Sequence, residues 1–249
     1  MSGYAGIVSR AERRPWATPD RPWSMGMTWL DLLFAHWAVE PGAIRASVPA
    51  ELELDEFDGR AWVGVVPFRM ARVRHRLAPA LPGLSGFPEL NLRTYVTVGG
   101  KPGVYFWSLD ATNRIAIETA RALFGLNYLT ARMRCERSGA EVRYESERRD
   151  RRGPPARLSC SYRGEGEAFG SEPASLEAFL TERYCLYTVR GGRVWRGEIH
   201  HETWRLRRAT WEARECDMAR LAGVDLRGEP ESLLAAEPLE VVAWTARRA

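Results

Sequence analysis

The chain has 249 residues, of which 45% are hydrophobic, and its formal net charge is +4. This length is enough for one large domain with a substantial core. No apolar run approaches the roughly 20 residues of a membrane helix, and the first residues contain no apolar signal segment. The 4 cysteines form no CxxC motif, so we expect a soluble cytoplasmic protein without structural zinc.

Arginine provides nearly all of the positive charge. Of the 36 basic residues Lys101 is the only lysine, and the others are spread along the chain. One dense run, residues 147–152, is followed by Gly-Pro-Pro and is typical of a solvated loop. A nucleic-acid-binding protein needs basic side chains gathered on one face, so the sequence favours no nucleic-acid partner.

The N-terminal segment, residues 1–24, is rich in arginine and proline and predicts an irregular arm. Trp16 and Trp23 would pin this arm onto the body of the protein. The apolar run 28–39 fits a buried strand or a helix, and the proline shortly after it favours a strand that stops there. That residue, Pro41, then opens a short helix at the position that proline prefers.

A second group of signals lies between residues 52 and 88. Asp58-Gly59 is a tight-turn dipeptide and predicts a hairpin between residues 52–57 and a returning strand over 60–74. Pro67 interrupts the returning strand and indicates a bulge or an edge position. Several prolines and glycines over residues 76–88 predict a loop.

The central stretch, residues 87–128, predicts a strand, a Gly99-Gly100 turn, a second strand and a helix. Counting outward from that turn, Glu89 faces Asp110. Alternation of side chains along each strand then separates two faces. One face is mostly apolar and contains Leu90, Leu92, Thr94, Tyr105, Trp107 and Leu109. The other face indicates a site and contains Glu89, Asn91, Arg93, Tyr95, Val104, Phe106, Ser108 and Asp110.

The rest of the chain alternates short elements with glycine turns. We expect a helix from about residue 113 to 124, a hairpin over 128–149, a strand at 157–163, a helix at 175–183, two strands within 184–212, a helix at 217–222 and a strand at 239–246. Strands joined by hairpins without a βαβ rhythm predict an α+β fold with a large antiparallel sheet, curled or closed to hide its edges. Residues 25–249 form a single domain in this interpretation.

The polar face of the central hairpin carries groups that suit a small anionic ligand. Arg93 can hold a carboxylate with two parallel hydrogen bonds. Glu89 and Asp110 can have raised pKa values in a low-dielectric cavity and act as acid or base. The alternative is a solvated polar face with an internal ion pair, which would contribute little. The expected substrate-binding residues are Arg93, Asn91, Tyr95, Phe106, Tyr128 and His36.

The histidines raise the question of a metal site. His200-His201-Glu202 is adjacent in sequence, but no HExxH motif occurs and His36 and His75 lie far away. On a strand His201 shares a face with Ile199, which favours a core or cavity-lining position, and we keep it as a candidate catalytic residue. His36 lies in an apolar run and fits either a hydrogen-bonded core histidine or an acid–base group. No nucleotide-binding glycine loop occurs, so we expect no metal and no cofactor.

Lys101 is the sole candidate for a Schiff-base amine. It lies at the predicted Gly-Gly turn, about eight strand steps from Glu89, or on the order of 25 Å at ~3.3 Å per residue. A catalytic lysine needs burial or a neighbouring cation to lower its pKa. We therefore expect Lys101 to be a turn residue.

Four stretches resemble one known family. They are RPWSMGMTWLDLLFAHWAV, ELELDEFDGRAWVGVVPFRM, FPELNLRTYVTVGGKPGVYFWSLDA and ERYCLYTVRGGRVWRGEIHH. Over roughly residues 21–244 the chain resembles the YqjF-like family of domains of unknown function, which is grouped with the acetoacetate decarboxylase-like superfamily. The resemblance implies a bent antiparallel sheet, partly closed as a cone or barrel around a ligand cavity, with short helices packed around it.

That resemblance also bears on the reaction. Decarboxylases of the superfamily form a Schiff base between a keto acid and a lysine in a Gly-x-Pro-Lys-like segment, just after the helix that follows the central hairpin. Here the matching segment, residues 124–130, is FGLNYLT and contains no lysine. An acidic residue before the preceding strand of the superfamily looks matched by Glu89. The resemblance thus implies a retained cavity without the amine.

Together these features favour a small-molecule protein with a polar-lined cavity for a compact organic acid or carbonyl compound. Acid–base chemistry such as enolisation or hydration stays open, with Glu89, Asp110 and His201 as catalytic candidates, whereas Schiff-base decarboxylation is not expected. The alternative is a non-catalytic ligand-binding or scaffold protein that uses the same cavity. The sequence does not decide whether the chain forms a homo-oligomer, and we expect no membrane partner.

Overall fold

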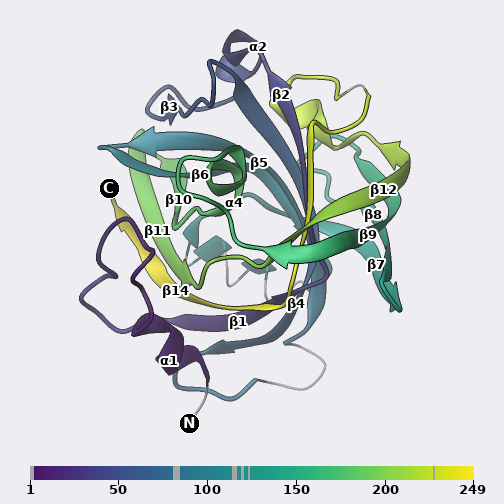
Figure 1. The fold of residues 1–249 in the computed structure, drawn as a ribbon. Coiled ribbons are helices and arrows are strands. Elements are labelled where there is room, and N and C mark those ends of the chain that lie inside the picture. The colour runs from purple at the N-terminus through teal and green to yellow at the C-terminus, as the bar shows by residue number, and fades with distance from the viewer. Residues whose placement is uncertain (1–2, 81–84, 114–116, 119–120, 123, 227) are drawn as a thin grey trace.

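The computed structural model describes residues 3–80, 85–113, 117–118, 121–122, 124–226 and 228–249. These residues form one 14-stranded sheet, bent into a partly closed ring with a few short helices around it (Figure 1). The predicted α+β fold with a bent and partly closed sheet is confirmed. The sheet is mixed rather than wholly antiparallel, because one central strand pairs in parallel with two of its neighbours.

The strands follow one another along the chain as β1 (Met25–Leu30), β2 (Leu32–Val39), β3 (Glu53–Leu54), β4 (Ala61–His75), β5 (Phe87–Val98), β6 (Lys101–Ala111), β7 (Tyr128–Ser138), β8 (Glu141–Arg148), β9 (Arg157–Phe169), β10 (Cys185–Arg190), β11 (Arg193–His201), β12 (Leu206–Cys216), β13 (Ser232–Ala236) and β14 (Leu239–Arg248). The helices are α1 (Gly3–Val8), α2 (Pro41–Arg45), α4 (Leu176–Thr181) and the 3-10 helix η1 (Met218–Ala222). Between β6 and β7, residues 117, 118, 121, 122 and 124 are helical. The other residues of that expected helix, 114–116, 119–120 and 123, lie outside the described part of the chain.

The strand pairings make two rings that share β4, β5 and β6. The first ring runs through β1, β14, β11, β10, β6, β5 and β4, and it closes where β4 pairs with β1. The second ring runs from β6 through β7, β8, β9, β12, β13 and β2 back to β4. Each ring encloses its own hydrophobic core, and on β4 Val65 faces one core while Val66 faces the other. Alternation of side chains along the shared strands causes this division.

Asp31 lies at the point where the two rings part. It separates β1 from β2 with a φ of 54°, a left-handed conformation that aspartate tolerates better than most residues. Both strands pair with β4, but β1 also pairs with β14 whereas β2 pairs with β13. The buried Asp31 carboxylate forms ion pairs with Arg69 at 2.8 Å and Arg137 at 2.6 Å. These contacts fix the junction.

Pro67 lies inside β4 at a position that needs only one partner strand. On one side it faces Leu90 of β5. On the other side the pairing with β2 ends at Val65, and the pairing with β1 begins at Arg69. Pro67 thus occupies an edge position within a central strand, as its sequence context predicts.

The central hairpin folds about Gly99-Gly100 as predicted, and both glycines have positive φ. The expected register holds from the turn as far as Arg93. Beyond that point an extra residue in β6 forms a bulge that shifts the register by one. Leu90 therefore faces Asp110, and the predicted pair of Glu89 with Asp110 is wrong. The bulge turns the Asp110 side chain to the face of Leu90, away from Glu89.

Other expectations differ from the structure in detail. Asp58-Gly59 closes only a bridge between Phe57 and Arg60, and β3 pairs with β5 instead of β4. The N-terminal arm contains α1, and Trp23 packs the arm onto Val242 and Trp244 of β14, as expected for a residue that pins it to the body. Residues 184–212 contain parts of three strands instead of two, and β13 is not among the predicted elements. These pairings depend on partners distant in sequence, which local turn chemistry does not specify.

Candidate functional site

A cavity of about 470 Å³ occupies the first ring. Its wall includes side chains from all seven strands of that ring and a few from neighbouring elements, and most of them are apolar. The expectation of a polar-lined cavity is therefore wrong in this respect. At one end Thr181, the last residue of α4, and Arg183 line the cavity. At the other end the lining residues His75, Ala78 and Pro79 are exposed, so the cavity opens there.

Strand β5 carries polar side chains in sequence along the cavity. Phe87, Glu89, Asn91 and Arg93 all line it, as expected for alternate residues of one strand. Phe87 begins β5 near the open end, whereas Arg93 contacts the last turn of α4. A ligand that reaches Arg93 from the opening therefore passes Glu89 and Asn91.

Arg93 is a buried guanidinium that has no carboxylate partner among the described residues. Its Nη2 donates to the Leu180 carbonyl at 2.9 Å and to the Tyr95 hydroxyl at 3.2 Å. Its Nε has no hydrogen-bond partner, and the guanidinium lies 5.1 Å from the centre of the Phe34 ring. Burying a cation without a counter-ion is costly, so this position favours an anion supplied by a ligand.

Tyr95 and His36 form a buried pair behind Arg93 and do not line the cavity. Tyr95 donates to the Leu180 carbonyl at 2.8 Å, and its oxygen lies 2.6 Å from His36 Nε2. A hydroxyl has a single hydrogen, so His36 must donate from Nε2. Burial, with a smaller contribution from the charge of Arg93, holds the pKa of His36 well below its usual value. The geometry makes both residues supports for Arg93 and not the ligand contacts that the sequence predicts.

Glu89 is 1% exposed and faces the cavity. Tyr128 donates to its Oε2 at 3.1 Å, and the Asn91 side chain forms a second hydrogen bond with it. Burial raises the pKa of Glu89 to about 8; the bonds from Tyr128 and Asn91 oppose this rise, and the charge of Asp110 adds to it. Near neutral pH the carboxyl group is mainly protonated, so it can donate a hydrogen bond to a ligand oxygen.

Three of the described side chains that line the cavity carry a buried polar atom without a hydrogen-bond partner. These atoms are Trp29 Nε1, Asn91 Oδ1 and Arg93 Nε. Buried polar groups in proteins are normally paired. The described wall of the cavity therefore contains two hydrogen-bond donors and one acceptor without partners. A ligand with oxygen atoms could accept hydrogen bonds from the two donors, and a hydroxyl group could donate to the acceptor.

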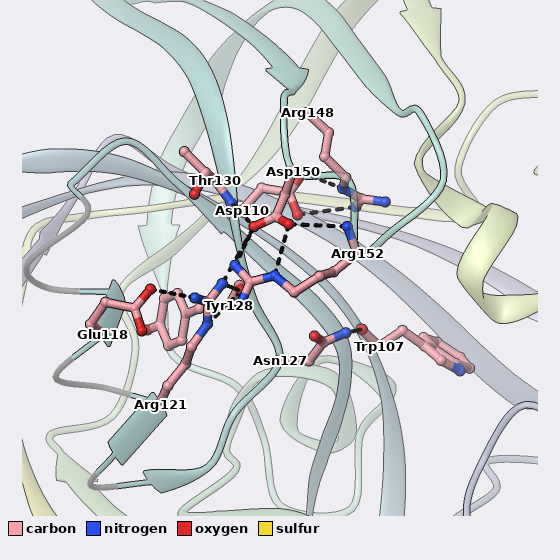
Figure 2. A network of polar contacts seen from close by, with 10 residues as sticks. All are labelled: Trp107, Asp110, Glu118, Arg121, Asn127, Tyr128, Thr130, Arg148, Asp150 and Arg152. Carbon is pink, nitrogen blue, oxygen red and sulfur yellow. Dashed lines mark hydrogen bonds and ion pairs between the residues drawn. The ribbon is translucent and has the colours of Figure 1, made fainter.

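Asp110 belongs to a different group. Its carboxylate accepts hydrogen bonds of 2.9 and 3.0 Å from Arg148, which also donates to Ser108 at 2.9 Å. Figure 2 shows Asp110 and Arg148 in this arrangement, and neither side chain has exposed surface. Asp110 is not a lining residue of the cavity. Its predicted place on the face of Glu89 is wrong because the bulge in β6 reverses its direction.

Tyr128 is held at the start of β7 by the polar contacts in Figure 2. Arg121 donates from Nε to the Tyr128 carbonyl at 3.0 Å and pairs with Glu118 at 2.5 Å. Asp150 accepts a hydrogen bond of 3.0 Å from the backbone N–H of Thr130. These contacts fix the backbone around Tyr128, so that its ring reaches across to Glu89.

His201 and Phe106 both line the cavity, as the sequence predicts. His201 donates from Nδ1 to the Glu202 carbonyl at 2.7 Å, and its ring packs on those of Tyr184 and Trp204. Burial lowers the pKa of His201. Its imidazole is therefore neutral near pH 7, and it lines the cavity as an uncharged polar group.

Trp29, Phe34 and Arg183 also line the cavity, but the sequence pattern does not identify them. They come from β1, from β2 and from the residues after α4, so no spacing connects them with β5. Arg183 donates to Asp55 at 2.5 Å and, unlike Arg93, has a counter-ion. Only the closure of the first ring brings these three side chains into one cavity.

Lys101 lies outside this site. Its Nζ is 5.3 Å from the centre of a Trp16 ring, and it is not a lining residue. In the described part of the chain, no group of three or more His, Cys, Asp or Glu side chains could hold a metal ion. No helix in that part is long and apolar enough to cross a membrane.

Sequence comparison connects the chain to one family and one bacterial relative. The DUF2071 family, described as an uncharacterized conserved protein, matches residues 26–240. The uncharacterized protein YqjF of Bacillus subtilis strain 168 is 40% identical over 242 residues, which cover 97% of this chain and 99% of YqjF.

Solved structures with the same fold are more distant in sequence. An acetoacetate decarboxylase-like enzyme from Sphingomonas wittichii RW1 has a TM-score of 0.63 at 14% identity, with 94% of this chain and 95% of that chain covered. The enduracididine biosynthesis enzyme MppR, complexed with pyruvate, has a TM-score of 0.62 at 11% identity, with 94% and 93% covered. At such low identity these similarities show the acetoacetate decarboxylase-like fold alone.

Proposed function

The chain belongs to the DUF2071 family, and from that premise we propose that its cavity binds an organic acid with a carbonyl or hydroxyl oxygen close to the carboxylate. The observation that carries this proposal is the buried guanidinium of Arg93, which lacks a carboxylate partner among the described residues. A ligand carboxylate would supply the missing counter-charge through charge-assisted hydrogen bonds.

The spacing of Glu89 and Arg93 supports a ligand with two oxygen-bearing groups. The two residues lie on the same face of β5 and are four positions apart, which separates their backbones by roughly 13 Å at ~3.3 Å per residue. Asn91 lies midway between them on that face. Long side chains that lean toward each other shorten this gap. A carboxylate held by Arg93 then places the next oxygen of the ligand near Asn91 and the protonated Glu89. A 2-oxo, 3-oxo or hydroxy acid has this pattern.

The fold relatives are consistent with such a ligand. MppR, which has the same fold, was determined in complex with pyruvate, a 2-oxo acid. In the present chain no lysine belongs to the described wall of the cavity. The proposed binding is therefore non-covalent, through Arg93 and hydrogen bonds, and not through an imine.

A second candidate function, proton exchange at the carbon beside a carbonyl group, is supported by the pKa of Glu89. A value of about 8 is close to the working pH, where an acid–base group is most effective. Ionised Glu89 would take a proton from that carbon, the C–H electron pair would form the C=C bond of an enolate, and the carbonyl oxygen would take the charge. Return of a proton from Glu89 to carbon completes the cycle.

Calorimetric titration with 2-oxooctanoate tests the binding proposal. The wild type is expected to bind, and Arg93→Met to lose affinity by about tenfold or more, since a hydrogen bond to a charged group contributes roughly 1.5–3 kcal/mol. Arg132 is exposed on β7 and does not line the cavity, so Arg132→Met is a control with the same change of charge. Equal affinity of wild type and Arg93→Met would place the anion elsewhere.

Deuterium uptake by the same acid in D2O, followed by NMR, tests the second candidate. The wild type is expected to exchange the hydrogens beside the carbonyl group faster than buffer does. Glu89→Gln should retain binding but lose this exchange, because an amide does not accept the proton. An equal exchange rate in both proteins would exclude Glu89 as the base.

A further inference from the structure

The cavity is larger than a compact organic acid requires. Its volume of about 470 Å³ lies in the range of sites that take drug-sized ligands, roughly 300–1,000 Å³. The polar groups described above occupy only part of the wall. The remaining wall has to contact something other than a carboxylate and its neighbouring oxygen.

Apolar side chains line the cavity on both sides of Glu89, and one apolar stretch runs from Glu89 toward the opening. Phe87 precedes Glu89 on β5 and faces Met70 of β4. Met25 of β1 and Val73 of β4 continue this apolar wall toward the exposed residues at the opening. At the other end of the cavity Arg93 lies against α4. At the opening itself Arg74 and His75 also line the cavity, so this apolar stretch of wall lies between polar groups at the two ends.

The buried charge of Arg93 gives a bound acid one orientation. With its carboxylate at Arg93, any chain attached to the acid runs past Glu89 toward Phe87 and Met70. The reverse orientation would leave the buried Arg93 without an anion, which is costly, whereas Arg74 at the opening already donates to the Arg76 and Ala78 carbonyls. Methionine side chains adapt readily to differing apolar shapes.

On the basis of the proposed function, we infer that the preferred ligands are carboxylic acids with a hydrophobic tail, either a straight chain of about six or more carbons or an aryl group. A compact acid at Arg93 would leave Phe87, Met70 and Met25 in contact with water. A tail removes that surface from water, and each buried methylene then strengthens binding by about fourfold. The carboxylate provides recognition and the tail provides most of the affinity.

A chain-length series on the wild-type protein tests this inference by calorimetry. Octanoate is expected to bind at least about a hundredfold more tightly than butanoate, since four more methylenes are buried. Equal affinity for both acids would overturn the inference and leave the anion site of the proposed function intact. Failure of every acid to bind would overturn both. Equal affinity for 1-octanol and octanoate would show that Arg93 does not bind the carboxylate, and this would contradict the inferred orientation of the ligand.

A pair of charge insertions locates the tail independently. Val73 is half-buried and lines the cavity near its opening, whereas Leu77 is 86% exposed and does not line it. Val73→Glu is expected to weaken octanoate binding about tenfold or more and to leave butanoate binding unchanged, and Leu77→Glu should affect neither. Unchanged octanoate binding in folded Val73→Glu would contradict the placement of the tail. If Val73→Glu does not fold, the chain-length series alone decides.

Discussion

Tyr128 donates its hydroxyl hydrogen to Oε2 of Glu89 at 3.1 Å, and the bond joins β7 to β5 across the strand between them. Both side chains line the cavity. The bond favours the ionised form of Glu89, yet burial outweighs it and keeps the pKa at about 8. Glu89 is therefore a neutral carboxyl group that changes its charge near the physiological range.

The raised pKa of Glu89 predicts a loss of stability with rising pH. Its pKa in the folded state, about 8, is above the ordinary 4.5, so its stabilising contribution is complete below 4.5 and declines as the pH rises toward 8. We expect the free energy of unfolding of wild type, minus that of Glu89→Gln, to fall by up to about 1.4 kcal/mol per pH unit in this window. Urea denaturation of both proteins at several pH values measures it. A difference that does not vary with pH would show that Glu89 is already ionised.

Arg93 and Arg148 are both buried, but only Arg148 has a carboxylate partner among the described residues. Arg93→Met should leave the unliganded protein as stable as the wild type or more so, because it removes an unpaired charge and the Leu180 carbonyl keeps its bond from Tyr95. Arg148→Met should cost about 3–5 kcal/mol, since it leaves Asp110 buried without its partner. Thermal unfolding of the two variants makes the comparison, and an equal loss in both would refute a ligand-binding role for Arg93.

Gly64 of β4 lies between His36 of β2 and Arg93 of β5, which pair with it on its two sides. A Cβ at this position would lie 2.8 Å from His36 Nε2 and 3.2 Å from Arg93 Cγ. Gly64→Ala is therefore expected to shift both side chains, to weaken acid binding and to cost about 1–3 kcal/mol of stability. Gly42→Ala is the matched control, because a Cβ there meets nothing within 4 Å. Unchanged acid binding in Gly64→Ala would mean that the position of Arg93 is not critical.

The environment of Lys101 predicts that no imine forms. Its Nζ lies near Trp16 and outside the described wall of the cavity, whereas an imine forms only where the amine contacts the bound keto acid. After incubation with acetoacetate and borohydride, mass spectrometry is expected to find Lys101 unmodified, with an acetoacetate decarboxylase as the positive control. A reduced adduct on Lys101 would contradict this prediction.

The half of the site that lies on β5 follows from local sequence. Alternation places Glu89, Asn91 and Arg93 on one face and Leu90 and Leu92 on the other, and the structure keeps this division. A strand with an apolar face toward a core has little freedom to reverse, because a slip by one residue would move its charged side chains from the cavity into the packed core. The Gly-Gly turn is similarly local, since it depends on the tolerance of glycine for positive φ.

The other half depends on contacts between distant segments. Strand alternation predicts Asp110 beside Glu89, but the bulge in β6 turns it toward Arg148. A bulge adds one residue at small local cost, and here it occurs in the strand that pairs in parallel with both β7 and β10. No local pattern contains that information. The same holds for the contribution of α4 to one end of the cavity and for the apolar character of its far wall.

Strand β5, which carries the polar groups of the site, also packs with its other face against the hydrophobic core of the second ring. Leu90 and Leu92 of β5 belong to the core of the second ring and are fully buried. Close-packed interiors have low compressibility, so this backing prevents β5 from moving outward when a ligand enters. Changes of shape are left to other parts of the wall, such as β1, where the methionines Met25 and Met27 adapt readily to different shapes. The cavity wall therefore has a rigid part and an adaptable part. The rigid part, on β5, fixes where the charged group of the ligand binds, and the adaptable part accommodates tails of different shape.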